Sequence, residues 1–369
     1  MTERIELKRT PLEAEHVALG AKMGPFAGWS MPIEYAGTLS EHRAVRERVG
    51  LFDLTHLGKV DVTGPDALAV VQRSVTNDVS KVEVGSAQYS MVLNEAGGIV
   101  DDLLVYRLAE DRYFVVPNAA NTAAVHATLL EEAGTANADV VVHETWAFLA
   151  VQGPRAVEVV GTVFAEAADL DYMQATETTY GDVPVVLART GYTGEVGFEL
   201  FPPEEVVVAL WRDLLEAGDA FQLEPVGLGA RDTLRLEMGY PLHGQDIGPD
   251  RTPLEAGASW AVSFDKGDFR GRPALVRQKE EGIPARLWGL RMTDRVIPRA
   301  HMPVLRLDGS PAGETTSGTF SPTLRQGVAL AYLSPREGFA EGDEVEVEVR
   351  AKKGRAVVTR PPFVESSPR

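Results

Sequence analysis

The chain has 369 residues, of which 44% are hydrophobic and 24% are charged, and its formal net charge at pH 7 is −18. This size and composition are typical of a soluble globular protein with two or three domains. The sequence has no cysteine, which excludes disulfides, thiolate metal sites and cysteine nucleophiles, and we expect no metal cofactor.

The charge and the apolar pattern also bear on partners and location. An acidic surface repels phosphate groups, so we expect neither a nucleic acid nor a membrane as partner. No run of about 18 apolar residues, the length of a membrane-spanning helix, is present. Residues 1–16 lack the apolar segment of a secretory signal. The expected location is therefore the cytoplasm.

The N-terminal part of the chain is expected to be mainly helical. Residues 11–49 are predicted to be mostly helix, because Thr10 fits an N-cap and Pro11 fits the first helical position. Residues 57–64 alternate between apolar and polar side chains, which predicts a strand, and residues 65–75 predict a short amphipathic helix.

Residues 86–118 predict an antiparallel meander, because three apolar-rich runs are separated by turn sequences. The predicted strands cover residues 86–93, 99–108 and 113–118. A helix, two strands, a second helix, a hairpin and an amphipathic helix are predicted next, at residues 119–134, 138–144, 146–153, 153–164, 183–203 and 204–218.

After residue 280 the pattern changes to short strands between turns, which indicates a small all-β domain. We place the boundary near residues 278–286 and expect an α+β region over 1–280 and an all-β domain over 281–369. The glycines at 227–232 do not form a dinucleotide fingerprint, because no strand–glycine–helix unit of the right spacing surrounds them.

An acidic pair interrupts the second strand of the predicted meander. Because side chains alternate between the faces of a strand, Asp102 shares a face with Tyr106, and Asp101 lies on the other. Tyr89 and Asn118, on the neighbouring strands, could reach Asp102 and complete a polar floor. Since an unpaired buried carboxylate is costly, the alternative is that one aspartate faces water and the other caps a turn.

Another carboxylate lies in the predicted hairpin at 183–203. Glu199 is on the opposite strand face from Phe198 and Leu200, where it could accept two charge-assisted hydrogen bonds from an aminopyrimidinone such as a pterin. Tyr192 could stack on a flat ring or donate a hydrogen bond. The simpler interpretation is an ordinary hairpin turn.

The order of residue types in the segment 227–246 is typical of a binding site rather than of a core helix. Its first two glycines allow a close approach of the backbone. Arg231 then lies at the expected start of a helix, where the helix dipole disfavours a cation. We therefore expect a partner for it, either Asp102, Glu199 or a ligand carboxylate, and the alternative is a surface pair with Asp232.

Two further candidates carry weaker signals. His56 is as compatible with a half-exposed loop position as with catalysis. Trp260 is expected to be an aromatic of the core or of a pocket wall. No Ser-His-Asp set, phosphate-binding loop or zinc-protease motif is present.

An ordered set of motifs between residues 10 and 365 resembles the folate-dependent aminomethyltransferase family, the T-proteins of the glycine cleavage system. The motifs, in chain order, are FAGWSMPIEY, GLFDLTHLGKVDVTGPDAL, TNDV, NEAGGIVDDLLVYR, VQGP, RTGYTGEVGFEL, GLGARDTLRLEMGYPLHGQD, TSGTFSPTL and ALAYL.

The resemblance implies a three-domain cloverleaf around a central tetrahydrofolate pocket, with a C-terminal β-barrel. Residues 1–280 would contain two intertwined α+β subdomains, one of them centred on residues 52–130. The implied reaction moves the one-carbon unit of the aminomethyl-dihydrolipoyl arm of lipoylated H-protein to tetrahydrofolate. Ammonia and 5,10-methylenetetrahydrofolate are the implied products.

The resemblance also assigns roles to residues. The active-site acid falls on the aspartate pair, and we choose Asp102 over Asp101 because it shares a face with Tyr106. Arg231 is the second expected catalytic residue, and Glu199 falls on the carboxylate that holds the pterin. The other residues expected to bind folate are Asp101, Tyr89, Tyr106, Asn118, Tyr172, Tyr192 and Trp260.

The implied chemistry joins an electrophilic one-carbon fragment to N5 of the reduced pterin. Binding both substrates in one site replaces a bimolecular encounter by an oriented one. We expect Asp102 to orient the folate amines and to stabilise the developing cation, without forming a covalent bond.

Two alternatives stay open from the sequence. One is a folate-dependent demethylase that acts on a small methylated sulfur or amine compound with the same scaffold. The other is a non-enzymatic folate-binding module, as in iron–sulfur maintenance proteins of the same superfamily. That class usually carries a reactive cysteine, which this chain lacks.

Overall fold

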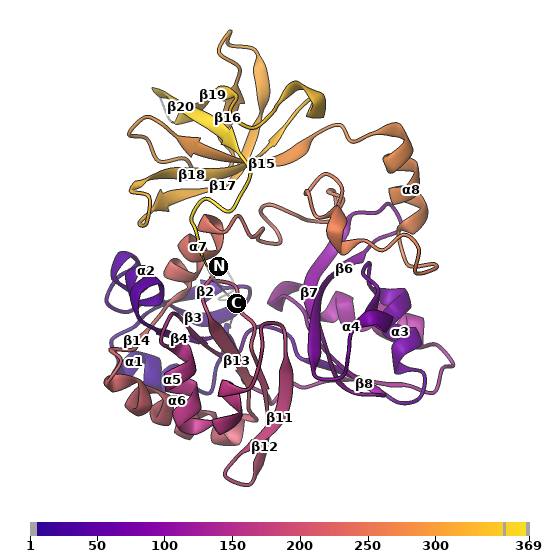
Figure 1. The fold of residues 1–369 in the computed structure, drawn as a ribbon, viewed down its shortest axis with the longest axis vertical. Coiled ribbons are helices and arrows are strands. Elements are labelled where there is room, and N and C mark those ends of the chain that lie inside the picture. The colour runs from indigo at the N-terminus through magenta and orange to yellow at the C-terminus, as the bar shows by residue number, and fades with distance from the viewer. Residues whose placement is uncertain (1–5, 350–351, 367–369) are drawn as a thin grey trace.

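The computed structural model describes residues 6–349 and 352–366. Two α+β lobes lie below a β-barrel in the view of Figure 1. The strands pair into a six-stranded sheet, a five-stranded sheet, a small three-stranded sheet and a closed six-stranded barrel. The predicted α+β class with a C-terminal β-barrel is confirmed.

The segment 11–49 contains a β-hairpin as well as helices, so the prediction of mainly helix was wrong for residues 22–34. The hairpin turns at Ala27 and Gly28, both at positive φ, as a tight two-residue turn requires. A proline in each strand also disfavours a helix there. The elements are β1 (Lys8–Arg9), α1 (Glu13–Ala18), β2 (Lys22–Phe26), β3 (Trp29–Glu34) and α2 (Thr38–Glu47).

The first lobe is built on the six-stranded sheet, in the order β11-β12-β13-β10-β4-β14. Helices α5 and α6 cover one face, where their apolar side chains share a buried cluster with β10, β12 and β13. The predicted hairpin at 183–203 is the antiparallel pair β12–β13. The elements are β4 (Gly50–Asp53), β10 (Leu149–Gln152), α5 (Ala156–Val163), β11 (Ala175–Tyr180), β12 (Val183–Ala188), β13 (Gly197–Phe201), α6 (Glu204–Asp219) and β14 (Glu224–Pro225).

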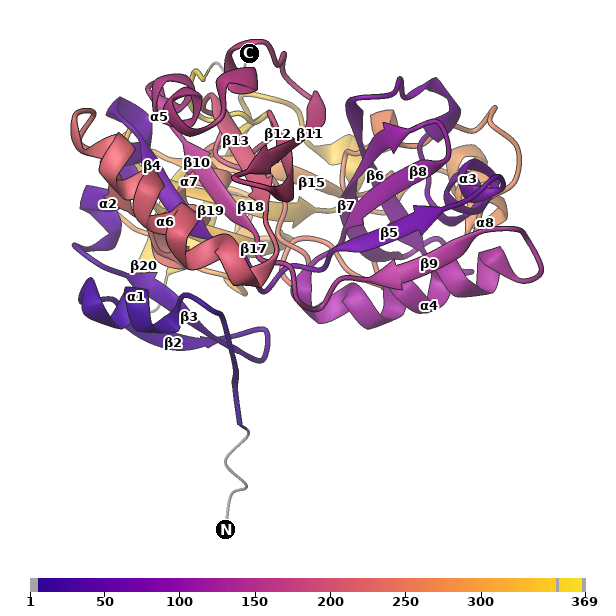
Figure 2. The ribbon, with the colours of Figure 1, turned by 90° about the horizontal axis from the view of Figure 1, so that it is seen from below.

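The second lobe contains the predicted meander, which is confirmed as the antiparallel series β6-β7-β8. Strands β5 and β9 extend this sheet, and helices α3 and α4 pack on one face. Figure 2 shows the two lobes side by side, with their helices on the outside. The elements are β5 (Val60–Thr63), α3 (Ala67–Ser74), β6 (Ser86–Leu93), β7 (Ile99–Ala109), β8 (Arg112–Val116), α4 (Thr122–Ala133) and β9 (Asp139–Val142).

The predicted alternation of β7 is confirmed by what its two faces contact. Leu103 and Val105 join the cluster beneath α3 and α4, whereas Leu104 and Tyr106 join a cluster shared with the first lobe. Asp102 is in phase with Leu104 and Tyr106, so it lies on the face of the second lobe that is turned toward the first.

The chain then passes through helix α7 to the barrel. The barrel closes in the order β15-β18-β17-β16-β19-β20 around its own apolar core. Its elements, with the two helices before it, are α7 (Leu228–Glu237), α8 (Arg272–Glu281), β15 (Arg286–Met292), β16 (Pro303–Leu305), β17 (Pro311–Ser321), β18 (Gln326–Leu333), β19 (Glu344–Val349) and β20 (Lys352–Thr359). Short 3-10 helices are η1 (Val79–Lys81), η2 (Ala119–Asn121), η3 (Ala165–Ala168), η4 (Ser259–Ala261) and η5 (Arg336–Gly338).

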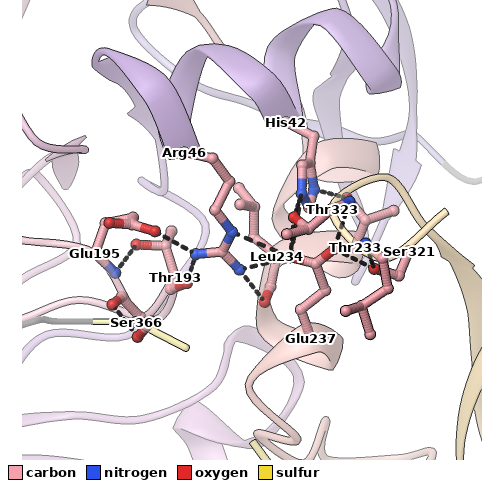
Figure 3. A network of polar contacts seen from close by, with 12 residues as sticks. His42, Arg46, Thr193, Glu195, Thr233, Leu234, Glu237, Ser321, Thr323 and Ser366 are labelled. Carbon is pink, nitrogen blue, oxygen red and sulfur yellow. Dashed lines mark hydrogen bonds and ion pairs between the residues drawn. The ribbon is translucent and has the colours of Figure 1, made fainter. Parts of the chain in front are cut away.

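A buried carboxylate at the end of α7 joins the barrel to the first lobe (Figure 3). Glu237 accepts hydrogen bonds from Arg46 of α2 at 2.9 and 3.1 Å, and its Oε2 lies 3.2 Å from His42 Nε2. Ser321, the last residue of β17, and Thr323, in the turn that follows it, donate to the same carboxylate. Burial opposes ionisation, but the contacts with His42 and Ser321 and the charge of Arg46 lower the pKa of Glu237 to about 2.

Glu237→Gln should lower the free energy of unfolding by about 3 kcal/mol, because it removes the fully buried counter-charge that Arg46 and His42 share, although Arg46 keeps its ion pair with Glu195. The lowered pKa stabilises the fold above the ordinary pKa of 4.5, and this stabilisation is lost as the pH falls toward 2. The difference between wild type and variant should therefore shrink in acid, as measured by urea unfolding. Glu158→Gln, in the exposed pair with Arg155, is the control and should change stability by less than about 0.5 kcal/mol.

Gly227→Ala tests the predicted close approach of the backbone at the start of α7. A Cβ atom at this position would lie 2.3 Å from the carbonyl oxygen of Ile33, although φ is an ordinary −91°. We expect a loss of about 1–3 kcal/mol in chemical denaturation. Gly161→Ala in α5, where a Cβ meets nothing within 4 Å, should hold or raise stability. Equal effects of the two substitutions would contradict the steric argument.

Candidate functional site

Asp102 lies on β7 and is held by the two residues that the sequence placed near it. Tyr89 of β6 donates its hydroxyl to Asp102 Oδ2 at 3.0 Å. Asn118, just after β8, donates its side-chain amide to Asp102 Oδ1 at 3.0 Å. Asp102 itself is half-buried, so the three polar groups form a floor with an accessible carboxylate.

Asp101 is fully buried and is satisfied by amides rather than by a cation. It accepts bonds from the backbone and side-chain amides of Asn118 at 2.9 and 2.8 Å, and from the side-chain amide of Asn121 at 2.7 Å. The alternative of one exposed aspartate and one turn cap is therefore wrong.

The same network extends to His243 in the loop after α7. The Asn121 amide also lies 2.9 Å from His243 Nδ1, and His243 Nε2 lies 3.0 Å from the carbonyl oxygen of Ile99. A carbonyl can only accept, so Nε2 carries the proton and Nδ1 accepts from Asn121. The loop after α7 is thus tied to the start of β7 beside the aspartate pair.

Both aspartates bind their protons more tightly than free carboxyl groups do. Burial, followed by the charge of Asp102, raises the pKa of Asp101 to about 7. Burial also raises the pKa of Asp102, although the hydrogen bond from Tyr89 opposes this. Two neighbouring carboxyls, one fully buried and one half-buried, resist joint ionisation, so the pair retains a proton close to neutral pH.

Glu199 of β13 forms a second buried carboxylate site. Thr190 and Tyr106 both donate to its Oε2, at 2.5 and 3.0 Å. Within residues 6–349 and 352–366, no group donates to Oε1, which keeps its acceptor capacity for another molecule. Burial raises the pKa of Glu199.

Tyr106 holds Glu199 and does not join the polar floor at Asp102. Its side chain has no exposed surface, and its hydroxyl contacts Thr190 and Glu199. A shared strand face correctly placed Tyr106 and Asp102 on one side of β7. The strand face did not determine which residue the Tyr106 hydroxyl contacts, because its partners come from the first lobe.

The side chain of Arg231, in the first turns of α7, has no hydrogen bond or ion pair to any residue that the structure describes. Its guanidinium lies 4.7 Å from the ring centroid of Tyr192. The charge of Arg231 also favours ionisation of Glu199, so the two groups lie close without a direct bond. The alternative pairing with Asp232 is wrong, because Asp232 bonds to Arg235 at 2.9 Å.

Aromatic side chains surround these polar groups. Tyr192 donates to the carbonyl of Pro241 and stacks on Tyr240 at 5.6 Å. Tyr172 raises the pKa of Tyr240, after the larger effect of burial, so Tyr172 is also nearby. Trp260 is not a core residue: 68% of its surface is exposed, and its ring stacks on Tyr89 at 5.3 Å.

His56 is buried, which contradicts the half-exposed loop position expected as one interpretation. Its Nδ1 has no hydrogen-bond partner within the described part of the chain. Burial, and then the charge of Arg231, lowers the pKa of His56 to about 3, so the ring is neutral at physiological pH. Its electrostatic coupling to Arg231 places it beside the site.

Three contributing residues escaped the sequence analysis: Asn121, Thr190 and His243. Asn121 follows Asn118 by three residues, and His243 lies inside the segment 227–246, so proximity in sequence was an available signal. Across residues 6–349 and 352–366, no group of three or more metal-binding side chains occurs. No helix in these ranges is long and apolar enough to cross a membrane.

Asp101→Asn tests the raised pKa of Asp101. The unfolded chain ionises this carboxyl near its ordinary value of 3.8, whereas the folded chain keeps it protonated up to about 7. Wild type should therefore lose stability relative to the variant as the pH rises through this window, and the difference should level off above it. Urea unfolding of both proteins at several pH values measures this. Parallel stability curves would contradict the assignment.

Comparison with known proteins gives matches over nearly the whole chain. A model of the GCVT N-terminal domain matches residues 12–266, and a model of the glycine cleavage T-protein C-terminal barrel domain matches residues 286–365. An aminomethyltransferase of Frankia alni is 50% identical over 366 residues, covering 99% of this chain and 100% of that protein. One of Mycobacterium tuberculosis is 46% identical over 364 residues, covering 99% of each chain.

A solved structure matches as well. The crystal structure of glycine cleavage system aminomethyltransferase T from Bartonella henselae superposes with a TM-score of 0.92 at 39% identity. The match covers 98% of this chain and 99% of that one. It includes the barrel and both α+β lobes.

Proposed function

The chain belongs to the glycine cleavage T-protein family and is an aminomethyltransferase of the glycine cleavage system, and we propose that tetrahydrofolate receives the one-carbon unit at the site described above. The family match favours this activity over the demethylase and the non-enzymatic module. Lipoylated H-protein is the proposed donor, and the cytoplasm is the proposed location.

The free oxygen of Glu199 beside the unpaired Arg231 is the observation that carries the proposal. Glu199 Oε2 already receives two hydrogen bonds, which fixes the carboxylate and directs Oε1 to another molecule. A pterin has an amine and a ring N–H that suit such an acceptor. Arg231 offers unused donors for the carboxylate or carbonyl groups of the same substrate.

The aspartate pair suits the proton transfer of the reaction. The donor's bonds from carbon to sulfur and to nitrogen are replaced by bonds to N5 and N10 of the folate. Two protons leave these nitrogens, and sulfur and ammonia each receive one. Asp102 is the accessible member of a pair that retains a proton near neutral pH. We infer that the proton retained by the pair is passed to the departing amine through Asp102, while Asp101, Asn118 and Tyr89 hold Asp102 in place.

The division of the chain at residue 280 also remains a proposal. The strand that opens the barrel begins at Arg286, after helix α8 ends at Glu281, which supports a linker there. The buried contacts of Glu237 cross this division, so we expect the two parts to separate only after the linker is cleaved and the interface is disrupted. Limited proteolysis followed by mass measurement of the fragments tests the boundary.

A coupled assay tests the function. The protein is mixed with tetrahydrofolate and aminomethylated H-protein, and ammonia and methylenetetrahydrofolate are followed together. Equal release of both products, dependent on the carrier protein, is the expected result. If the protein binds folate and turns over a small methyl donor without the carrier protein, both the proposed donor and the proposed reaction are wrong.

Asp102→Asn should reduce turnover by about a hundredfold or more while tetrahydrofolate binding changes little, because the variant keeps the shape but cannot pass on the proton of the pair. Glu199→Gln is the matched comparison and should weaken folate binding by about tenfold through loss of a charge-assisted bond. Equilibrium binding and the turnover number at saturating folate separate the two effects. Unchanged turnover of Asp102→Asn would rule out its proposed role.

A further inference from the structure

One end of the barrel carries an open cavity that takes no part in the polar network around Asp102, Glu199 and Arg231. Its volume is about 350 Å³. Strand β15 begins here, and β18 and β20 end here, as their antiparallel pairing with β15 shows. The lining residues are Arg286, Trp288, Arg336, Phe339, Ala340, Glu341 and Arg360.

The arginines of this cavity are poorly compensated. The guanidinium groups of Arg286 and Arg336 make no ion pair or hydrogen bond with any side chain that the structure describes. Arg360 has one distant partner, Glu341, at 3.9 Å, and both side chains are more than half exposed. Among the described side chains of the lining, Glu341 is the acidic one, and the other charged groups are the three guanidinium groups.

The three cations are close enough to repel one another. The guanidinium carbons of Arg286 and Arg360 lie 5.1 and 5.9 Å from the ring centroid of Trp288. Burial, followed by the charges of Arg360 and Arg336, lowers the pKa of Arg286. Such a cluster is unusual in a chain with 54 acidic and 36 basic residues, where counter-charges are abundant. The fold thus brings three arginines close together and places two of them, Arg286 and Arg360, at one aromatic ring.

An unsatisfied donor lies in the same lining. Trp288 is 4% exposed, and its indole N–H has no acceptor among the described residues. A buried donor without an acceptor costs about 1–3 kcal/mol. The mouth of a β-barrel with convergent polar groups is a common place for a small ligand. The nitrogen itself is covered, so an anionic oxygen in the open cavity would be bound by the guanidinium groups.

We propose that the barrel-end cavity binds a compact anion with two or more negative charges, carried on carboxylate or phosphate groups. The charges of Arg360 and Arg336 act on Arg286, and an anion with two or more charges would offset the repulsion among the three guanidinium groups. The forked guanidinium binds both types of group through paired hydrogen bonds. The recessed cavity and its aromatic lining favour a small molecule over the flat surface of a macromolecule.

Isothermal titration calorimetry at constant ionic strength tests the site, with inorganic phosphate and citrate as separate probes. Wild type should bind at least one of them saturably. The double substitution Arg286→Gln and Arg336→Gln should weaken that binding by at least about tenfold. Arg291→Gln is the control, because Arg291 is an exposed arginine of the same strand outside the cavity lining, and its binding should match wild type.

A second pair of substitutions separates charge from geometry. Arg286→Lys with Arg336→Lys keeps the charge but removes the fork, so affinity should fall between wild type and the glutamine variant. Phosphate binding without citrate binding would assign the phosphate class, and the reverse result would assign the carboxylate class. Far-ultraviolet circular dichroism verifies folding. If the double variant does not fold, the exposed Arg336→Gln alone should still weaken binding measurably.

The proposal is overturned if the glutamine variants bind as tightly as wild type, or if neither probe binds saturably. Binding of a polyglutamate peptide in the absence of phosphate and citrate binding would instead assign this end of the barrel to an acidic protein partner. None of these outcomes depends on aminomethyl transfer, so the proposed reaction can stand or fall independently.

Discussion

The buried ionic contacts of helix α7 fix the position of the barrel relative to the first lobe. Glu237, at its end, joins α2 to the end of β17, and Arg235, two residues earlier, bonds to Asp246 at 2.6 Å and to Ser317 of the barrel at 2.9 Å. Removing one partner of a buried pair leaves an uncompensated charge, so the loss of either contact would strongly destabilise the fold. The position of Arg231 on the same helix, and of the loop that carries His243, follows from this anchoring.

Burial alone does not decide how a carboxylate of this protein behaves; its partners do. Glu237 is buried among a guanidinium, an imidazole and hydroxyls, and its pKa is lowered to about 2. Asp101 is buried among neutral amides and beside another carboxylate, and its pKa is raised to about 7. The first arrangement suits a permanent structural charge, whereas the second suits a group that exchanges a proton.

A similar contrast separates two arginines one turn apart on α7. Arg235 is almost fully buried, and its donors are used by Asp232, Asp246, Ser317 and the carbonyl of Tyr240. Arg231 rests on the ring of Tyr192 and keeps its donors free within the described structure. The helix therefore builds the interface with one arginine and supplies an open cationic group to the site with the other. Arg286 and Arg336 at the barrel end likewise keep guanidinium donors that no described side chain uses.

The sequence by itself determined the features that depend on local periodicity and on motif order. It predicted the meander, the two faces of β7, the contacts of Tyr89 and Asn118 with Asp102, the C-terminal barrel and the family. It missed the hairpin at residues 22–34, because turn residues and prolines there override a helical reading.

Only the tertiary structure decided which polar groups meet across the lobes. Tyr106 bonds to Glu199 from 93 positions away, and Asn121 reaches His243 from 122 positions away. It also placed Trp260 at the surface and left Arg231 without a direct partner. The physical reason is that a strand's alternation specifies the direction of a side chain, whereas its contacts depend on how distant segments pack against it.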